Sequence, residues 1–171
     1  MCELTLMRES VTRWSLTVAI PNDSGDLVRQ DSGTHMDHPT YQLLVADDDV
    51  DFRQAVCEIF APFFRVIEVE SGEEAVERIS REEVHLALFD MHMKHLSGLD
   101  ALRQLRALHI VAPCIIVTSD YTESLRDDAE QAAAFSVLRK PVTRRILVNT
   151  VARAVETAYD DSEFTHRLLC G

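Results

Sequence analysis

Short apolar runs alternate with longer segments of helical periodicity between residues 41 and 158, and this alternation restricts the possible folds more than any other feature. Runs rich in Val, Ile, Leu and Phe are typical of strands buried on both faces, whereas apolar residues three and four positions apart indicate helices with one buried face. The pattern predicts strands over residues 41–46, 64–69, 84–89, 113–118 and 136–139, and helices over residues 50–60, 71–81, 98–108, 122–134 and 142–158.

Parallel strands need long crossover connections, and a helix after each strand provides them. The predicted fold is therefore an α/β fold with a five-stranded parallel sheet, doubly wound so that helices cover both faces. We expect one domain over residues 41–158, preceded by a mostly disordered arm over residues 1–40 and followed by a short C-terminal tail over residues 159–171.

The arm leaves other interpretations open. Apolar residues alternate with less apolar neighbours, as in a strand, at Trp14, Leu16, Val18 and Ile20. The arm could therefore add an edge strand or act as a docking peptide instead of being disordered. Translation could also begin at Met36, directly before the regular pattern.

Composition disfavours several classes of partner. The chain has 17 basic and 29 acidic residues, and its net charge of −12 is unfavourable for contact with nucleic-acid phosphates or an anionic membrane surface. It contains no apolar run of the ~18 residues that a membrane helix needs, and no signal-peptide pattern. The four cysteines form no CxxC pair, and the five glycines form no phosphate-binding loop. We expect a cytoplasmic protein with reduced thiols and no nucleic-acid or membrane partner.

Four of the predicted strands end in residues that carry chemistry. Such ends meet at one edge of a parallel sheet, where α/β folds bind their ligands. Carboxylates gathered there repel one another unless a cation is present, and oxygen ligands suit Mg²⁺. A hydroxyl and an ammonium beside them suit a bound phosphoryl group. The residues are Asp47, Asp48 and Asp49, then Asp90, then Thr118 and Ser119, then Lys140 and Pro141.

These residues and their apolar neighbours resemble the receiver domains of two-component response regulators. The resemblance lies in residues 43–49 (LLVADDD), 90–93 (DMHM) with Gly98 beyond them, 117–119 (VTS) and 138–141 (LRKP). It covers residues 41 to 158, which is the whole region of regular pattern. The resemblance implies a flavodoxin-like receiver fold with strand order 2-1-3-4-5, in a stand-alone receiver that signals through protein contacts.

The resemblance also implies a phosphorylation site that uses Mg²⁺. Asp90 corresponds to the phosphoacceptor, which receives the phosphoryl group from a histidine kinase or a phosphotransfer protein. Asp48, Asp90 and the backbone carbonyl of His92 correspond to the metal ligands, and Asp47 to the partner acid that holds metal-bound water or Lys140. Lys140 corresponds to the lysine that pairs first with Asp90 and then with the phosphoryl oxygens.

Thr118 corresponds to the hydroxyl that hydrogen-bonds the phosphoryl group and moves the loop beyond it. The implied outcome is a changed affinity for a downstream protein effector, in a monomer or a phosphorylation-dependent dimer. The partner face comprises the fourth helix, the fifth strand and the fifth helix, and includes Arg139. The family usually has an aromatic residue where this chain has Val137, and strand alternation predicts that Phe135 shares the face of Val137. Val137 therefore either has only a packing role or belongs to a conformational switch that differs from the usual one of the family.

Other loop positions also bear on function. His92 and Asp120 lie two residues after Asp90 and Thr118, at positions that tune the lifetime of the phosphoryl group in the family. Lys94 stands where the family often has proline, and we expect it to be a solvated loop residue. His92 and His95 leave a transition-metal site open, although no third soft ligand is nearby. Two further histidines are expected to be structural, His85 and His109.

Two alternative functions remain. A Mg²⁺-dependent phosphatase of the haloacid dehalogenase type also uses an aspartate after a parallel strand, but it has a second aspartate where this chain has His92. A degenerate receiver would act only as a binding module, and the presence of every expected side chain argues against it. The leading hypothesis is a signalling module that is not an enzyme, apart from its own phosphorylation and autodephosphorylation.

Overall fold

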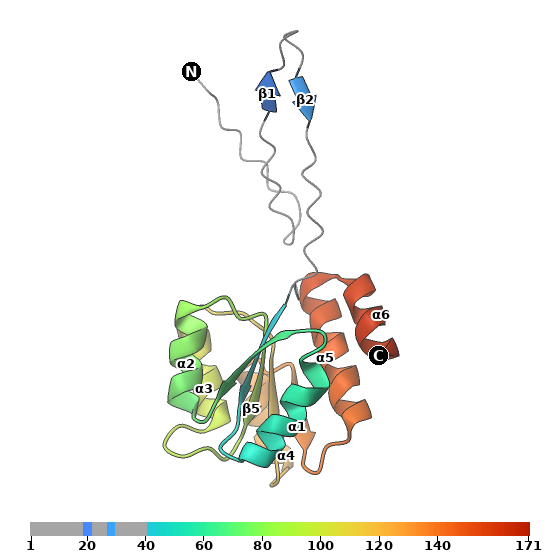
Figure 1. The fold of residues 1–171 in the computed structure, drawn as a ribbon. Helices are drawn as coiled ribbons and strands as arrows, with labels where there is room; N and C mark the ends of the chain where they lie inside the picture. Colours follow the sequence, from blue (N-terminus) through green and yellow to red (C-terminus); the bar gives the residue numbers. More distant parts are fainter. Residues whose placement is uncertain (1–18, 22–26, 30–40) are drawn as a thin grey trace. The chain divides into compact units, whose positions relative to one another are not determined.

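The computed structural model describes residues 19–21, 27–29 and 41–171 (Figure 1). Contacts within the chain separate residues 1–38 from residues 39–171. In the first unit, β1 (Ala19–Pro21) pairs antiparallel with β2 (Leu27–Arg29). The other positions of interest in the arm lie outside the described residues: Trp14, Leu16, Val18 and Met36.

The second unit contains the predicted five-stranded parallel sheet. Its strands are β3 (Gln42–Ala46), β4 (Arg65–Val69), β5 (Leu86–Asp90), β6 (Cys114–Thr118) and β7 (Ser136–Arg139). They are ordered β4-β3-β5-β6-β7, which confirms the predicted order 2-1-3-4-5. Ala46 lies opposite Phe89, and Asp90 lies opposite Val117. The carboxyl ends of β3, β5 and β6 are therefore nearly level.

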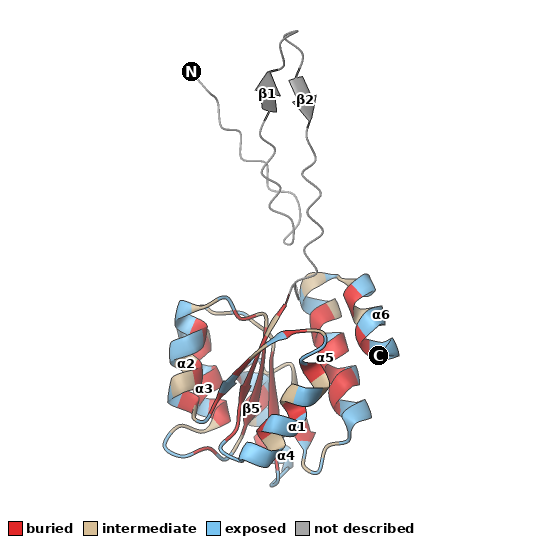
Figure 2. Ribbon diagram, viewed as in Figure 1, coloured by how far each residue is buried: buried red, intermediate tan, exposed pale blue. Residues whose placement is uncertain are grey.

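Helices cover both faces of the sheet (Figure 1). Side chains of α1, α5 and α6 pack on one face with Leu43 and Val45, and side chains of α2, α3 and α4 pack on the other face with Leu44 and Ala46. The bounds are α1 (Val50–Phe60), α2 (Gly72–Arg81), α3 (Gly98–Ala107), α4 (Glu123–Gln131), α5 (Arg144–Tyr159) and α6 (Ser162–Cys170). Residues 43–46 of β3 face the two cores in turn, as strand alternation requires, and these four are buried. Figure 2 shows buried residues in the sheet and exposed residues on the outer sides of the helices.

Several elements begin or end away from their predicted limits. α4 stops at Gln131 instead of residue 134, and Ala133 beyond it adopts a left-handed conformation with a φ of 57°. α5 begins at Arg144, because the side chain of Thr143 caps its first turn. β5 extends through Asp90, so this aspartate ends the strand rather than following it. Across the described helices, none is long and apolar enough to span a bilayer.

The sequence pattern predicts no helix after residue 158, yet α6 forms there. Phe164 and Leu168 lie four residues apart and are buried in the core that α1 and α5 share. Asp161 caps the helix, because its side chain accepts a hydrogen bond from the Phe164 amide. Residues 159–171 thus include a packed helix that extends the layer formed by α1 and α5 (Figure 1).

Candidate functional site

Three aspartates come together at the carboxyl edge of the sheet. Asp47 directly follows β3 and Asp90 ends the neighbouring strand β5, so the parallel register brings these two side chains together. One carboxylate oxygen from each of Asp47, Asp48 and Asp90 lies within 4.8 Å of the others. In the described part of the chain, no comparable group of three ligand side chains includes His92 or His95.

Lys140 bridges the two buried carboxylates. Its Nζ lies 2.8 Å from Asp47 Oδ2 and 2.7 Å from Asp90 Oδ1. Its backbone amide donates to the Thr118 carbonyl at 2.7 Å, which fixes the segment after β7 against the end of β6. The ammonium also lies 4.1 Å from the centre of the Phe52 ring in α1. The sequence did not identify Phe52 as part of the site, because its helical spacing indicates only a core position.

Backbone amides hold the same two carboxylates through their other oxygens. Asp47 Oδ1 accepts a hydrogen bond from the Asp49 amide at 2.8 Å, and Asp90 Oδ2 accepts one from the His92 amide at 2.6 Å. A carboxylate offers about four lone-pair sites. Each group therefore keeps acceptor capacity for a further ligand after Lys140 and the amide are bound.

Gly98 explains how α3 approaches the end of β5. A Cβ atom at this position would collide with the carbonyl oxygen of Asp90 and crowd the side chain of Phe89. The Gly98 amide donates to the Met91 carbonyl at 3.3 Å, which fastens the start of α3 to the loop after Asp90. A side chain at residue 98 would therefore displace either α3 or the backbone that carries Asp90.

The pocket has more negative than positive charge. Asp47 is 1% exposed and Asp90 is 6% exposed. Burial raises the pKa of Asp47, although the hydrogen bonds from Lys140 and Asp49 act in the opposite direction. Burial alone would lower the pKa of Lys140, but its hydrogen bonds to Asp47 and Asp90 and the attraction of their charges together outweigh burial and raise it. The three neighbouring carboxylates, two of which contact Lys140, form an oxygen-rich donor set that fits Mg²⁺.

Thr118 is linked to both positions that the family resemblance associates with phosphoryl lifetime. Its buried hydroxyl accepts a hydrogen bond from the Asp120 amide at 3.1 Å and lies 3.4 Å from His92 Nε2. The same His92 nitrogen lies 3.3 Å from Asp120 Oδ2. His92 therefore connects the loop after β5 with the loop after β6.

Val137 and Phe135 do not share a face, contrary to the prediction from strand alternation. Val137 packs with the core of α2, α3 and α4, whereas Phe135 packs with the core of α1 and α5. Phe135 precedes β7, which begins at Ser136, so the alternation of the strand does not extend to it. Arg139 is exposed and lies opposite Thr118 in the ladder.

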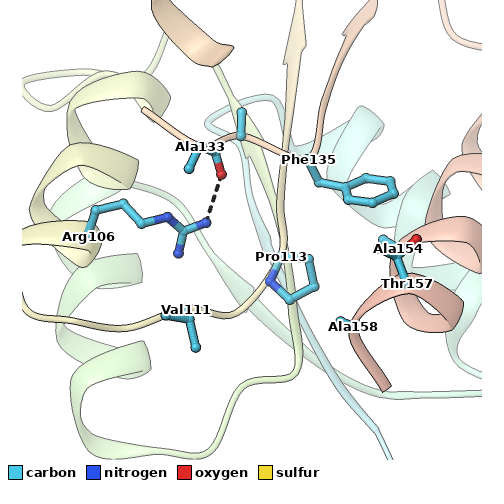
Figure 3. A pocket seen from close by; sticks show the side chains of 9 residues that line it. Arg106, Val111, Pro113, Ala133, Phe135, Ala154, Thr157 and Ala158 are labelled. Atoms are coloured by element: carbon cyan, nitrogen blue, oxygen red, sulfur yellow. Dashed lines mark hydrogen bonds between the residues drawn. The ribbon is translucent and has the colours of Figure 1, made fainter. Parts of the chain in front are cut away.

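Phe135 instead lines a cavity of about 440 Å³ at the amino-terminal edge of the sheet (Figure 3). Its ring points toward Ala154 of α5, and Pro113 lies on the same wall just before β6. Arg106 also lines the cavity, but its guanidinium donates to the Ala133 carbonyl at 3.0 Å. The cavity is therefore mostly apolar and lies at the edge opposite Asp90.

Comparison with known proteins identifies related sequences. The family model described as the response regulator receiver domain matches residues 43–152. The chain is 29% identical over 116 residues to the sensory/regulatory protein RpfC of Xanthomonas campestris pv. campestris, covering 65% of this chain and 16% of RpfC. It is 28% identical over 122 residues to the transcriptional regulatory protein GlrR of Escherichia coli K12, covering 71% of this chain and 28% of GlrR. The match thus spans less than a third of either relative.

Solved receiver structures share the fold. A CheY-like response regulator receiver domain protein from Methanospirillum hungatei matches with a TM-score of 0.67 and 22% identity, over 71% of this chain and 98% of that chain. The receiver domain of the Francisella response regulator 1452 matches with a TM-score of 0.65 and 24% identity, over 68% of this chain and 98% of that chain.

Proposed function

The chain belongs to the response regulator receiver domain family, and we propose that it accepts a phosphoryl group on Asp90 from a histidine kinase or a phosphotransfer protein. Receiver domains are signalling modules of two-component systems that work with kinases and effector domains. The observation that carries the proposal is the contact of one ammonium, that of Lys140, with both Asp47 and Asp90. This arrangement combines a carboxylate nucleophile with a fixed positive charge.

We propose Mg²⁺ as the cofactor. Receiver domains generally bind Mg²⁺ at an acidic pocket, and the three neighbouring carboxylates here offer the oxygen ligands that this ion prefers. Asp47, Asp48, Asp90 and the backbone carbonyl of His92 would hold it. When bound, Mg²⁺ supplies positive charge that offsets the charge of the phosphoryl oxygens.

In the proposed transfer, a carboxylate oxygen of Asp90 forms a bond to phosphorus while the P–N bond of the donor phosphohistidine breaks. The electron pair of the broken bond stays on the imidazole nitrogen, and Asp90 becomes an acyl phosphate. Lys140 would stabilise the charge on the phosphoryl oxygens, since its ammonium already contacts Asp90 Oδ1 at 2.7 Å.

We propose that Thr118 links phosphorylation to a partner surface. Thr118 ends β6, which lies between β5 with Asp90 and β7 with Arg139. A shift of Thr118 toward a phosphoryl group would change the packing of α4, β7 and α5, a region where Arg139 is exposed and where Val137 and Phe135 pack in different cores. A downstream protein effector would bind this region, in a cytoplasmic monomer or phosphorylation-dependent dimer.

We propose that His92 and Asp120 tune the lifetime of the phosphoryl group. Their side chains lie 3.3 Å apart, and His92 also lies 3.4 Å from the Thr118 hydroxyl. This contact connects the loop of the phosphoacceptor with the loop of the proposed switch residue. Variants of His92 and of Asp120 test this proposal. The rate at which each labelled variant loses its phosphate shows whether the pair speeds or slows hydrolysis.

The test is incubation of the full chain with labelled acetyl phosphate and Mg²⁺. We expect the wild type to gain acid-labile phosphate and the Asp90→Asn variant to gain none, because the amide cannot act as the nucleophile. Asp127→Asn is the matched control, since Asp127 is an exposed α4 residue whose ion-pair partner is its neighbour Arg126. It should label like the wild type.

The same experiment separates the alternative functions. A wild type that gains no phosphate, with folded protein and Mg²⁺ present, would contradict the proposal and favour a degenerate receiver. Steady turnover of p-nitrophenyl phosphate that Asp90→Asn abolishes would instead favour a phosphatase. We expect no such turnover.

A further inference from the structure

Arg53 is a buried charged residue next to the acidic pocket. It lies in α1, and its side chain is only 8% exposed. Taking a guanidinium out of water is costly unless hydrogen bonds and opposite charges compensate it. The contacts that compensate Arg53 therefore indicate what the residue does.

The guanidinium of Arg53 contacts the ends of two strands. Nη1 donates to the backbone carbonyl of Asp47 at 2.6 Å, just beyond β3. Nη2 donates to Glu70 at 3.2 Å, and Nε lies 3.4 Å from Glu68 Oε2 near the end of β4. These three contacts join α1 to the carboxyl ends of β3 and β4, beside Asp47 of the pocket.

We propose that Arg53 is a positioning residue that orients Asp47 and Asp48 for Mg²⁺ binding, an inference that rests on the proposed function above. The Asp47 carbonyl belongs to the peptide plane that joins Asp47 to Asp48. Because a peptide unit is planar, holding this carbonyl limits the directions in which both Cα atoms, and hence both side chains, can lie.

Asp48 depends on this support more than its neighbours do. The side chains of Asp47 and Asp90 are held by Lys140 and by backbone amides. Asp48 is exposed, and its carboxylate makes no hydrogen bond or ion pair with the described residues. The backbone on either side is therefore what places this proposed ligand, and Arg53 fixes that backbone.

Removing Arg53 should change the affinity for Mg²⁺ in opposite directions, depending on whether Arg53 acts through its charge or by positioning the backbone. Glu68 and Glu70 together more than offset the charge of Arg53, because two carboxylates face one guanidinium. Replacing Arg53 by an uncharged residue would leave these carboxylates uncompensated, and electrostatics alone would then tighten Mg²⁺ binding. Loss of positioning would weaken binding instead. The sign of the change therefore distinguishes the two effects.

The experiment measures the Mg²⁺ dissociation constant of the full chain by isothermal titration calorimetry, together with the urea midpoint of each protein. Residues that orient metal ligands typically change affinity 10- to 100-fold when they are replaced. We expect Arg53→Met to bind Mg²⁺ about tenfold more weakly. Glu70→Gln is the matched control, because it removes a contact of Arg53 but keeps the bond to the Asp47 carbonyl. It should stay within about twofold of the wild type.

If Arg53→Met does not fold, Arg53→Lys is the variant whose Mg²⁺ binding is measured instead. A lysine keeps the charge but cannot reproduce the fork of donors, so it should also weaken Mg²⁺ binding. Unchanged or tighter Mg²⁺ binding in a folded Arg53 variant overturns the inference and leaves only a structural role, even if the urea midpoint falls. A wild type that binds no Mg²⁺ instead contradicts the proposed function itself.

Discussion

His85 shows how one buried side chain can make stability depend on pH. It lies just before β5, where its Nδ1 accepts a hydrogen bond from the Gln42 amide at 3.1 Å. Nδ1 can accept this bond only when it carries no proton. Burial lowers the pKa of His85, and the nearby Glu83 only partly offsets this effect. The folded state therefore favours the neutral imidazole.

The contribution of His85 to stability should be complete above the unfolded-state pKa of about 6.5 and should be lost as the pH falls through the lower, folded-state pKa. We expect the free energy of unfolding to decrease between about pH 7.5 and about pH 5.5, measured by urea titration. His85→Asn should flatten this dependence, because Asn can accept the same hydrogen bond without titrating in this range. Exposed His109 tests specificity, and His109→Asn should keep the wild-type slope.

Single residues also show the limits of inference from sequence. Asp47, Asp90, Thr118 and Lys140 were predictable as neighbours, because parallel strand ends meet at one edge and the motif assigns one residue to each end. Phe135 was not, because its side chain direction depends on where β7 begins, and that is set by pairing with β6.

At the scale of elements, α6 is a packed helix that the sequence pattern did not predict. The Phe164 ring lies 4.7 Å from the centre of the Tyr41 ring and 5.0 Å from that of Phe64. Phe164→Ala should lower the free energy of unfolding by about 3–5 kcal/mol, because it removes a buried ring and leaves a cavity. Urea unfolding measures this loss. His166→Ala on the exposed side of the same helix should change stability by less than about 0.5 kcal/mol. Equal stability of the two variants would mean that α6 does not hold the core in solution.

There is a physical reason why the sequence pattern did not predict α6. A short helix is marginal by itself, and most of its stability comes from tertiary packing rather than from local propensity. Only the pair Phe164 and Leu168 and the cap at Asp161 indicate it locally. The five pairs of strand and helix between residues 41 and 158 were predictable, because each contains several apolar residues spaced as a strand or a helix requires.

At the scale of the whole molecule, we propose that residues 39–171 fold as an independent unit. Contacts within the chain separate this region from residues 1–38, close to the boundary predicted at residue 40. A chain that starts at Pro39 should keep the urea midpoint and the acetyl phosphate labelling of the full chain. A chain that ends at Tyr159 should lose stability, because it lacks the packing of α6. Unfolding of the chain that starts at Pro39 would show that the preceding residues complete the fold.

The alternation of strands and helices predicted a parallel sheet, but not by itself the order of the strands. Several orders satisfy the same alternation and the same right-handed crossovers. The order 2-1-3-4-5 came from the family resemblance, and the structure confirms it.

The bond between Lys140 and Asp47 joins residues 93 positions apart. Contacts of such long sequence separation require the closure of a large loop, and chains rich in them fold slowly. The two charges can meet only after β7 has joined β6 at the far side of the sheet from β4. A growing or partly folded chain therefore has the aspartate but not the ammonium beside it. The contact of Lys140 with both aspartates, on which the proposed function rests, therefore forms late in folding.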